Sequence, residues 1–157
     1  MTDTPRVPER PSILPWRADR VPGATWIPVH AVVAAAVGAV PADVSIDVSR
    51  NHVLHADPAV LSDLLADLVA RARRANGAAT GPGRREVVVT SVLLADAIEV
   101  EVADSGPVLS VVERAWLDRQ STRAARLGGT LEVRACPEGG TALTLRLPRR
   151  LTERRAA

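Results

Sequence analysis

The segment from Asp57 to Gly77 is the clearest helix in the sequence, and it constrains the fold more than any other feature. Asp57 is a residue type that caps helices, and Pro58 suits the first helical position, where no backbone N–H is needed. Apolar residues then recur every three or four positions as far as Ala72, and Asn76-Gly77 supplies a stop. A helix with one apolar stripe must pack against another apolar layer.

Short strands surround this helix. Val44, Ile46 and Val48 alternate with polar residues, which is typical of a half-buried strand. The predicted order is α-β-β-α-β-β-α-β-β, which indicates an α+β fold: a two-layer α/β sandwich with helices on one face of a mixed sheet. The other predicted helices span 29–40 and 111–127, and the predicted strands span 44–48, 52–55, 86–92, 97–102, 130–134 and 142–147.

The length of 157 residues is that of one domain. Five prolines in the first 25 residues and the lack of a hydrophobic period predict a flexible, proline-rich arm over 1–26. The folded domain is expected to span 27–148, with a basic tail over 149–157.

The basic residues exclude several functions. All 20 of them are arginine, so a P-loop, which needs its lysine, and lysine Schiff-base chemistry are both excluded. A net charge of +2 and the absence of Phe and Tyr argue against nucleic-acid binding. The chain has no apolar run of membrane-spanning length and no apolar leader, so we expect a cytoplasmic protein with no membrane partner.

Three segments, in chain order, carry a family resemblance. Residues 56–72 have the pattern of an A-D-P helix that ends in an asparagine box. Residues 100–106 look like a strand entering a D-x-G-x-G box, and residues 128–148 look like a closing G-G-T-L to G-T to L-P hairpin. Together they resemble the ATP-binding domain of histidine kinases, in the superfamily of gyrase, heat-shock chaperone and mismatch-repair ATPases. The resemblance covers residues 27–148 and implies ATP or ADP as the ligand.

The resemblance assigns the adenine end of the site to three residues. Asp104 matches the aspartate that accepts the exocyclic amine of adenine, and a carboxylate is chemically suited to that donor. Gly106 matches a glycine that lets the base approach, and Thr141 matches a threonine that assists through water. The alternative is that Asp104 to Pro107 form only a strand-ending turn.

The metal position departs from the family. Arg71 stands where the family has the asparagine that holds Mg²⁺, and a guanidinium offers no lone pair to a metal. Mg²⁺ is therefore not expected as a cofactor. Asp67, one turn earlier, is expected to form an i, i+4 ion pair with Arg71; the alternative is that Asp67 activates water, as in gyrase-type ATPases.

The phosphate-binding part also departs from the family. Only 128 − 104 = 24 residues separate Asp104 from Gly128, and a predicted helix fills most of them. The family places a mobile lid and a second glycine box there, whose backbone N–H groups hold phosphates. Gly106 is the only glycine before Gly128 in this interval, and Pro107 removes one N–H. We therefore expect no catalytic residues and no phosphoryl transfer.

The histidines and the single cysteine of the sequence do not indicate a second catalytic or metal site. A histidine kinase carries its phosphoacceptor histidine on a separate helical hairpin. The candidates here are His30, His52 and His55, and we expect the residues before the domain to be too few to build that hairpin. We expect His52 and His55 to be solvated strand residues. Cys136 has no identifiable base beside it, and Trp116 is expected in the core.

The sequence thus predicts a degenerate ATPase-fold protein. Its expected role is that of a non-catalytic signalling or protein-interaction module in a bacterial two-component-like pathway. The expected partner is a response regulator, a kinase or an anti-sigma-type protein, and a homodimer is a further arrangement to test. The alternative is a functional ATP-binding protein or kinase of the same superfamily. A third hypothesis, nucleic-acid association, rests only on the arginine clusters.

Overall fold

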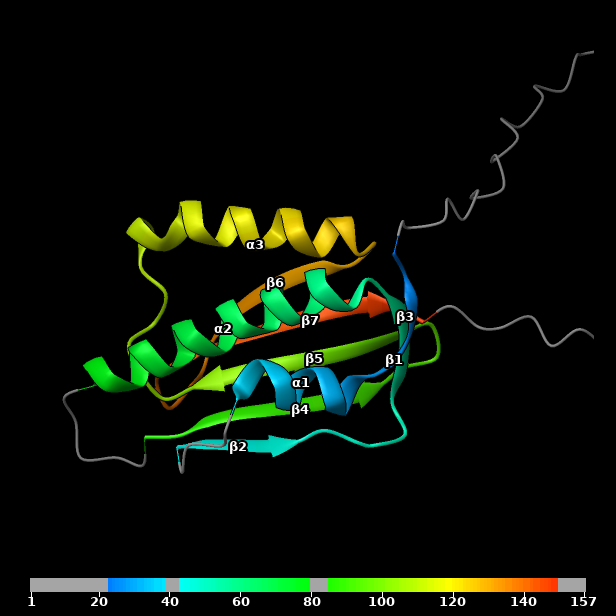
Figure 1. Cartoon of the computed structure of the whole chain (residues 1–157). Helices are drawn as coiled ribbons and strands as arrows, with labels where there is room; N and C mark the ends of the chain where they lie inside the picture. Colours follow the sequence, from blue (N-terminus) through cyan, green and yellow to red (C-terminus); the bar gives the residue numbers. More distant parts are fainter. Residues whose placement is uncertain (1–22, 39–42, 80–84, 150–157) are drawn as a thin grey trace, which may run out of the picture.

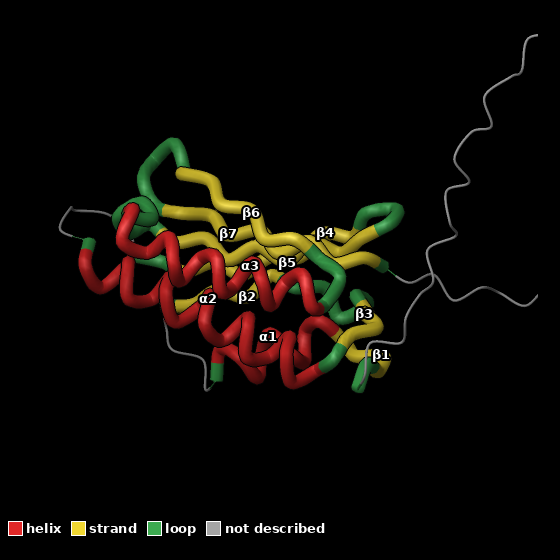
Figure 2. The backbone as a smooth tube through the Cα atoms, turned by 90° about the horizontal axis from the view of Figure 1, so that it is seen from above, coloured by secondary structure: helices red, strands yellow, loops and turns green. Residues whose placement is uncertain are grey.

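A five-stranded mixed sheet forms one layer of the structure, and three helices cover one of its faces (Figures 1 and 2). The structure is a computed structural model that describes residues 23–38, 43–79 and 85–149. Within these residues the elements are β1 (Thr25–Pro28), α1 (Val29–Val37), β2 (Val44–Asp47), β3 (Val53–Ala56), α2 (Pro58–Ala78), β4 (Val87–Leu93), β5 (Ala97–Asp104), the 3-10 turn η1 (Val111–Glu113), α3 (Arg114–Arg126), β6 (Thr130–Ala135) and β7 (Thr141–Pro148).

The strand order of the sheet is β2-β4-β5-β7-β6. β2 runs parallel to β4, and the other neighbouring pairs are antiparallel. The predicted two-layer α+β sandwich with a mixed sheet is therefore confirmed, and each predicted helix and strand has a counterpart in the structure.

The sequence did not predict β1, which pairs antiparallel with β3 in a separate two-stranded sheet. This strand begins at Thr25, two residues before the predicted start of the domain. Four residues that include a proline carry no alternation of their own, and the pairing with β3 makes them a strand. Residues 1–22 of the predicted arm, residues 150–157 of the basic tail, and the last two residues of the predicted 29–40 helix lie outside the described residues.

The core lies between the helices and the inner face of the sheet. Along β5, buried Ile98, Val100 and Val102 alternate with the half-buried Glu99 and Glu101. The helix α2 lies across this face and buries its predicted apolar stripe, except that Val60 in the first turn is only partly buried. Its fully buried leucines are Leu61, Leu64, Leu65 and Leu68.

Charged and polar side chains cover the opposite face of the sheet. Glu101 accepts hydrogen bonds from Arg134 (3.1 Å) and Thr144 (3.0 Å), and Arg146 donates to Glu99 (3.5 Å). These residues come from three neighbouring strands, so they form cross-strand pairs. A face of this kind is solvated, and the fold therefore has two layers and not three.

No helix within the described residues has the length and the apolar character needed to cross a membrane.

The predicted 111–127 helix begins as the η1 turn and continues as α3.

The N-terminus of α2 supplies a first prediction. The Asp57 carboxylate accepts hydrogen bonds from the backbone N–H groups of Ala59 (2.9 Å) and Val60 (3.2 Å). Asp57→Ala leaves both donors without this partner, so the free energy of unfolding should fall by about 1 kcal/mol in urea denaturation. Asp63→Ala, at an exposed position of the same helix, should change it by less than about 0.5 kcal/mol. Equal losses in the two variants would contradict the capping role.

Candidate functional site

Arg71 lies on α2 and reaches the carboxyl end of β5. Its Nη1 donates to Oδ2 of Asp104 at 2.5 Å, and the two side chains are 3% and 0% exposed. A guanidinium does not lose its proton in proteins, so burying it requires an anionic partner. Asp104 supplies that partner at the position where the resemblance places the adenine site.

The remaining donors of Arg71 hold the segment that follows β5. Its Nε donates to Oε1 of Glu113 at 3.2 Å, and its Nη2 donates to the carbonyl of Pro107 at 3.4 Å. One side chain on α2 therefore ties together the end of β5, the 105–110 loop and η1.

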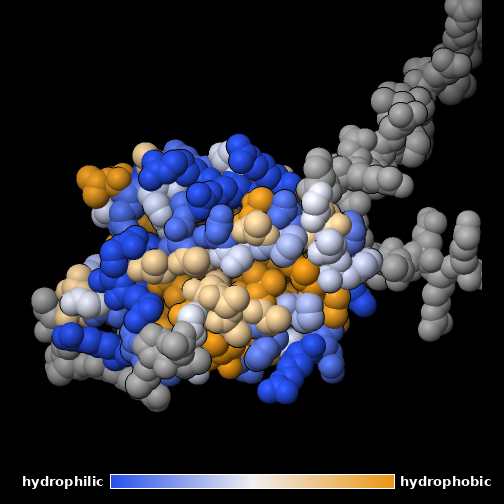
Figure 3. Space-filling model, in the orientation of Figure 1, coloured by the Kyte–Doolittle hydropathy of each residue, from blue (hydrophilic) through white to orange (hydrophobic). Residues whose placement is uncertain are grey.

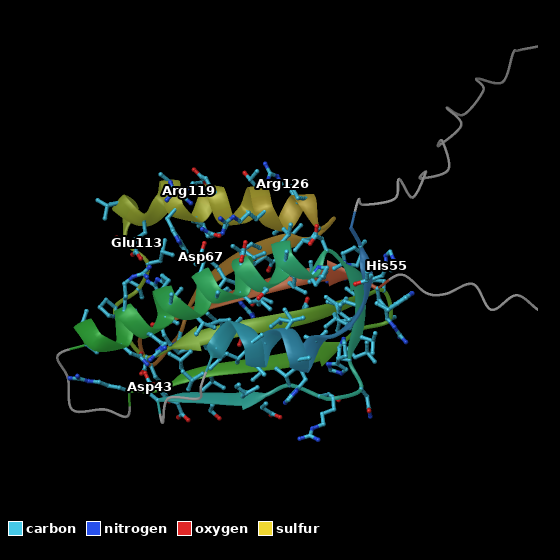
Figure 4. All side chains as sticks on the ribbon, in the orientation of Figure 1. Asp43, His55, Asp67, Glu113, Arg119 and Arg126 are labelled. Atoms are coloured by element: carbon cyan, nitrogen blue, oxygen red, sulfur yellow. The ribbon has the colours of Figure 1, made fainter. Side chains whose placement is uncertain are left out.

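Glu113 lies where the chain enters α3 (Figure 4). Its Oε2 accepts from the backbone N–H (2.9 Å) and the hydroxyl (3.0 Å) of Ser110, which completes a capping box. The Ser110 backbone N–H, with a further contribution from Arg71, lowers the pKa of Glu113. One carboxylate oxygen of Glu113 thus binds Arg71 and the other binds Ser110, and together they fix the η1 turn.

The carboxyl group of Asp104 is enclosed by the chain itself. Its Oδ1 accepts from the backbone N–H of Gly106 at 2.9 Å. Burial raises the pKa of Asp104 above its usual value, and the Gly106 N–H, the charge of Arg71 and the Thr141 N–H partly offset this. The same carboxyl group therefore joins α2, the turn after β5 and the start of β7.

Two glycines at this end allow close contacts within the chain. A Cβ at Gly106 would overlap the backbone carbonyl of Ala75 on α2, and a Cβ at Gly140 would overlap the carbonyl of Asp104. At Gly106, the missing side chain makes room for the helix backbone.

The structure brings Asp104, Gly106 and Thr141 together, as the resemblance implies. Thr141 is buried, and its hydroxyl accepts from the backbone N–H of Leu109 at 3.1 Å. Because the polar groups of these residues bind other parts of the chain, the site as it stands does not fit an adenine base. Adenine binding by the three residues stays a prediction, and it requires Arg71 to leave Asp104.

The metal position does not fit Mg²⁺ either. Arg71 stands where the resemblance places a metal-binding amide, and it is a cation buried against a carboxylate. The described parts of the chain contain no cluster of three or more His, Cys, Asp or Glu that could hold a metal ion.

The predicted ion pair between Asp67 and Arg71 is wrong. Asp67 lies on α2, on the side that faces α3 (Figure 4), and its carboxylate accepts a hydrogen bond from Nη1 of Arg123 at 2.5 Å. Arg71 falls on the apolar stripe of α2, at helical spacing from Leu64 and Leu68, so its side chain points into the core. The position of Arg71 on the apolar stripe would therefore have been sufficient to predict from the sequence that its side chain is buried.

Glu113, the second carboxylate on Arg71, was not among the predicted site residues. The local signal was present, because Ser110-x-x-Glu113 is the capping-box pattern. The contact with Arg71, 42 residues away in the chain, has no local signal.

His55 lies on β3 and His52 directly before it, and both side chains are half-buried and not solvated as predicted. Nδ1 of His52 lies 2.8 Å from the hydroxyl of Ser91. The ring of His55 packs edge-on against Trp26, with the ring centres 5.2 Å apart.

Trp116 is partly buried and packs against the core, in line with its predicted position. Burial and the negative charges of Asp104 and Glu101 raise the pKa of the Cys136 thiol. A raised thiol pKa disfavours the nucleophilic thiolate.

No family model matches this sequence, and no curated protein matches it. Solved structures do. The catalytic domain of histidine kinase ThkA matches with a TM-score of 0.68 at 15% identity, over 80% of this chain and 96% of that one. The ATP-binding domain of PrrB from Mycobacterium tuberculosis gives 0.65 at 20% identity, over 82% and 99%. The histidine kinase domain of the E. coli osmosensor EnvZ gives 0.64 at 15% identity, over 84% and 92%.

Two arginine–aspartate contacts of equal length give a second prediction. Arg71→Met leaves Asp104 buried without its cation, so the free energy of unfolding should fall by roughly 3–5 kcal/mol at pH 7. Arg123→Met removes the contact with Asp67, whose partners are 40% and 45% exposed, and should cost at most about 1 kcal/mol. Urea denaturation of both variants measures the difference.

The stability loss in Arg71→Met should depend on pH through Asp104. Removing Arg71 removes a charge that lowers the pKa of Asp104 in the parent, so this pKa should be higher in the variant than in the parent. A carboxyl group whose pKa is raised by folding binds its proton more readily in the folded state, so protonation stabilises that state. The loss in Arg71→Met should therefore shrink as the pH falls toward the ordinary aspartate value of 3.8. A loss that stays constant or grows on acidification would contradict the assignment to Asp104.

Proposed function

We propose that this chain, which has the fold of histidine kinase ATP-binding domains, is a non-catalytic protein-interaction module. The observation that carries the proposal is the buried contact between Arg71 and Asp104. The resemblance assigns Arg71 to the family's metal position and Asp104 to the carboxylate that the family uses for adenine, and this contact joins the two.

A nucleotide at this site would compete with that contact. Adenine would have to displace Arg71 from Asp104, and breaking one side of a buried ion pair costs roughly 3–5 kcal/mol. A weak ligand at millimolar affinity gains only about 4 kcal/mol at the standard state. The internal contact is therefore strong enough to oppose nucleotide binding.

The segment after Asp104 supports the same proposal. In the family this interval carries the lid and the second glycine box. Here the hydrogen bonds of Arg71 to Pro107 and Glu113 and the hydrogen bond from Leu109 to Thr141 hold it against the domain. A segment held in this way does not present a flexible row of N–H groups to phosphates.

The pathway is proposed from the neighbours in fold. They are sensor and histidine kinase domains, so we propose a cytoplasmic role in bacterial two-component-like signalling. The partner would be a response regulator, a kinase or an anti-sigma-type protein, and a second copy of the chain is the arrangement to test beside them.

Calorimetric titration of the purified chain with ATP and ADP, each with and without Mg²⁺, tests the proposal. We expect no saturable heat up to about 1 mM nucleotide. Phosphate release from ATP, measured on the same sample, should not exceed the protein-free rate.

Two results would overturn the proposal. Binding that Mg²⁺ strengthens, or turnover of ATP, would favour the alternative of a functional ATP-binding protein or kinase. Binding that Mg²⁺ leaves unchanged and that Asp104→Asn abolishes would make the chain a nucleotide sensor. Asp67→Asn is the matched control, because Asp67 binds Arg123 and not Arg71.

A further inference from the structure

A groove lies between the segment after β5, the start of α3 and the end of β6, and Thr141 of the candidate site is among its lining residues. Its volume is about 310 Å³. Its walls are aliphatic side chains, one arginine from α3 and three consecutive residues of β6. The lining includes Val108, Leu117, Val133, Val111, Arg114 and Arg134.

Two adjacent valines project beside this groove. Val111 and Val112 are 91% and 86% exposed, the highest values among the large hydrophobic residues of the described chain, and Val108 is also exposed. Figure 3 shows an apolar protrusion next to the hydrophilic surface of the α3 side. Because the capping box and Arg71 fix η1, these valines are held out in a defined position and do not fold back to cover themselves. Exposed apolar side chains that cluster at a groove are typical of a contact surface.

Two arginines line the groove, Arg114 from α3 and Arg134 from β6, and Arg134 is paired with Glu101. The helix α3 carries four arginines and one aspartate, Asp118. Arg123 is the only one of these arginines with an ion pair among the described residues. Arg119 and Arg126 point outward from α3 (Figure 4) and are not among the residues that line the groove, whereas Arg114 lines it. The charge that complements Arg114 is negative.

The strand β6 gives the occupant its shape. It is an edge strand whose only partner in the described sheet is β7. An edge strand leaves alternate backbone N–H and C=O groups free for an added extended segment. Residues 133–135 of this strand line the groove, so a segment lying in the groove runs along that edge.

We propose that this groove binds an extended segment of a protein partner that carries both aliphatic and acidic side chains. The aliphatic side chains contact Val111, Val112 and the groove wall, the carboxylates face Arg114, and the backbone pairs with β6. The inference rests on the proposed function of a protein-interaction module and names its surface and the chemistry of its partner.

Synthetic peptides of about ten residues provide the probe. One array contains sequences built from Asp, Glu, Leu, Val and Ile, and a second array replaces the acids with Lys and Arg. A third array keeps the acids and replaces the aliphatic residues with Ser. The purified full chain should bind only members of the first array, and fluorescence polarisation of the labelled hits should weaken as NaCl rises from about 50 mM to about 500 mM.

Variants then locate the binding. Val111→Asp/Val112→Asp and Arg114→Glu should each weaken the binding of a hit by about tenfold or more. These side chains are exposed, so the variants should keep the thermal stability of the parent. The matched controls are Val92→Asp/Leu93→Asp, at exposed positions on β4, and Arg50→Glu, in the turn before β3. Each control should change the affinity by less than about twofold. N-methylation of alternate peptide bonds should abolish binding, because it removes the donors that pair with β6.

The outcomes separate this inference from the proposed function. Failure of the first array, equal binding of the basic array, or no response to the groove variants would overturn the groove and leave the non-catalytic module standing. So would a hit that keeps its affinity on N-methylation or binds with unchanged affinity at high salt. Mg²⁺-dependent ATP turnover in the parent chain would overturn the proposed function, whatever the peptides do.

Discussion

The buried Arg71–Asp104 contact is the interaction on which this end of the molecule depends. A guanidinium that cannot lose its proton lies in the core, so the chain must bring a carboxylate to it. Asp104 comes from the end of β5, while Glu113 and the Pro107 carbonyl take the remaining donors. The hydrogen bonds of the Arg71 guanidinium therefore position the 105–110 loop, η1 and the start of α3.

Burial distinguishes this contact from a second one of the same length. Arg123 and Asp67 also lie 2.5 Å apart, but water reaches both partners. Their attraction is screened, and each remains solvated if the other is removed. Arg71 and Asp104 have no such alternative, so their contact defines a structure, whereas the exposed pair only joins two helix surfaces.

The same contact supports both proposals, the non-catalytic module and its contact surface. It occupies the carboxylate that the resemblance assigns to adenine, and it holds the following segment against the domain. That segment then presents Val111 and Val112 to solvent beside a basic helix and an edge strand. Under both proposals, the residues that the resemblance assigns to a nucleotide site serve as an internal support for an external contact surface.

The sequence by itself determined the elements and the layer arrangement. The Asp57 cap, the apolar stripe of α2 and the alternation along β5 are local patterns of side-chain spacing, and they predict the helices, the strands and the buried faces. Tertiary structure alone decided the partner of Arg71, because Asp104 lies 33 residues away and only the packing of α2 on the sheet brings the two together. It also decided β1, which is a strand only because β3 supplies its hydrogen bonds. Spacing along a chain defines which face a residue occupies, whereas the charge that it meets there depends on which distant segment packs against that face.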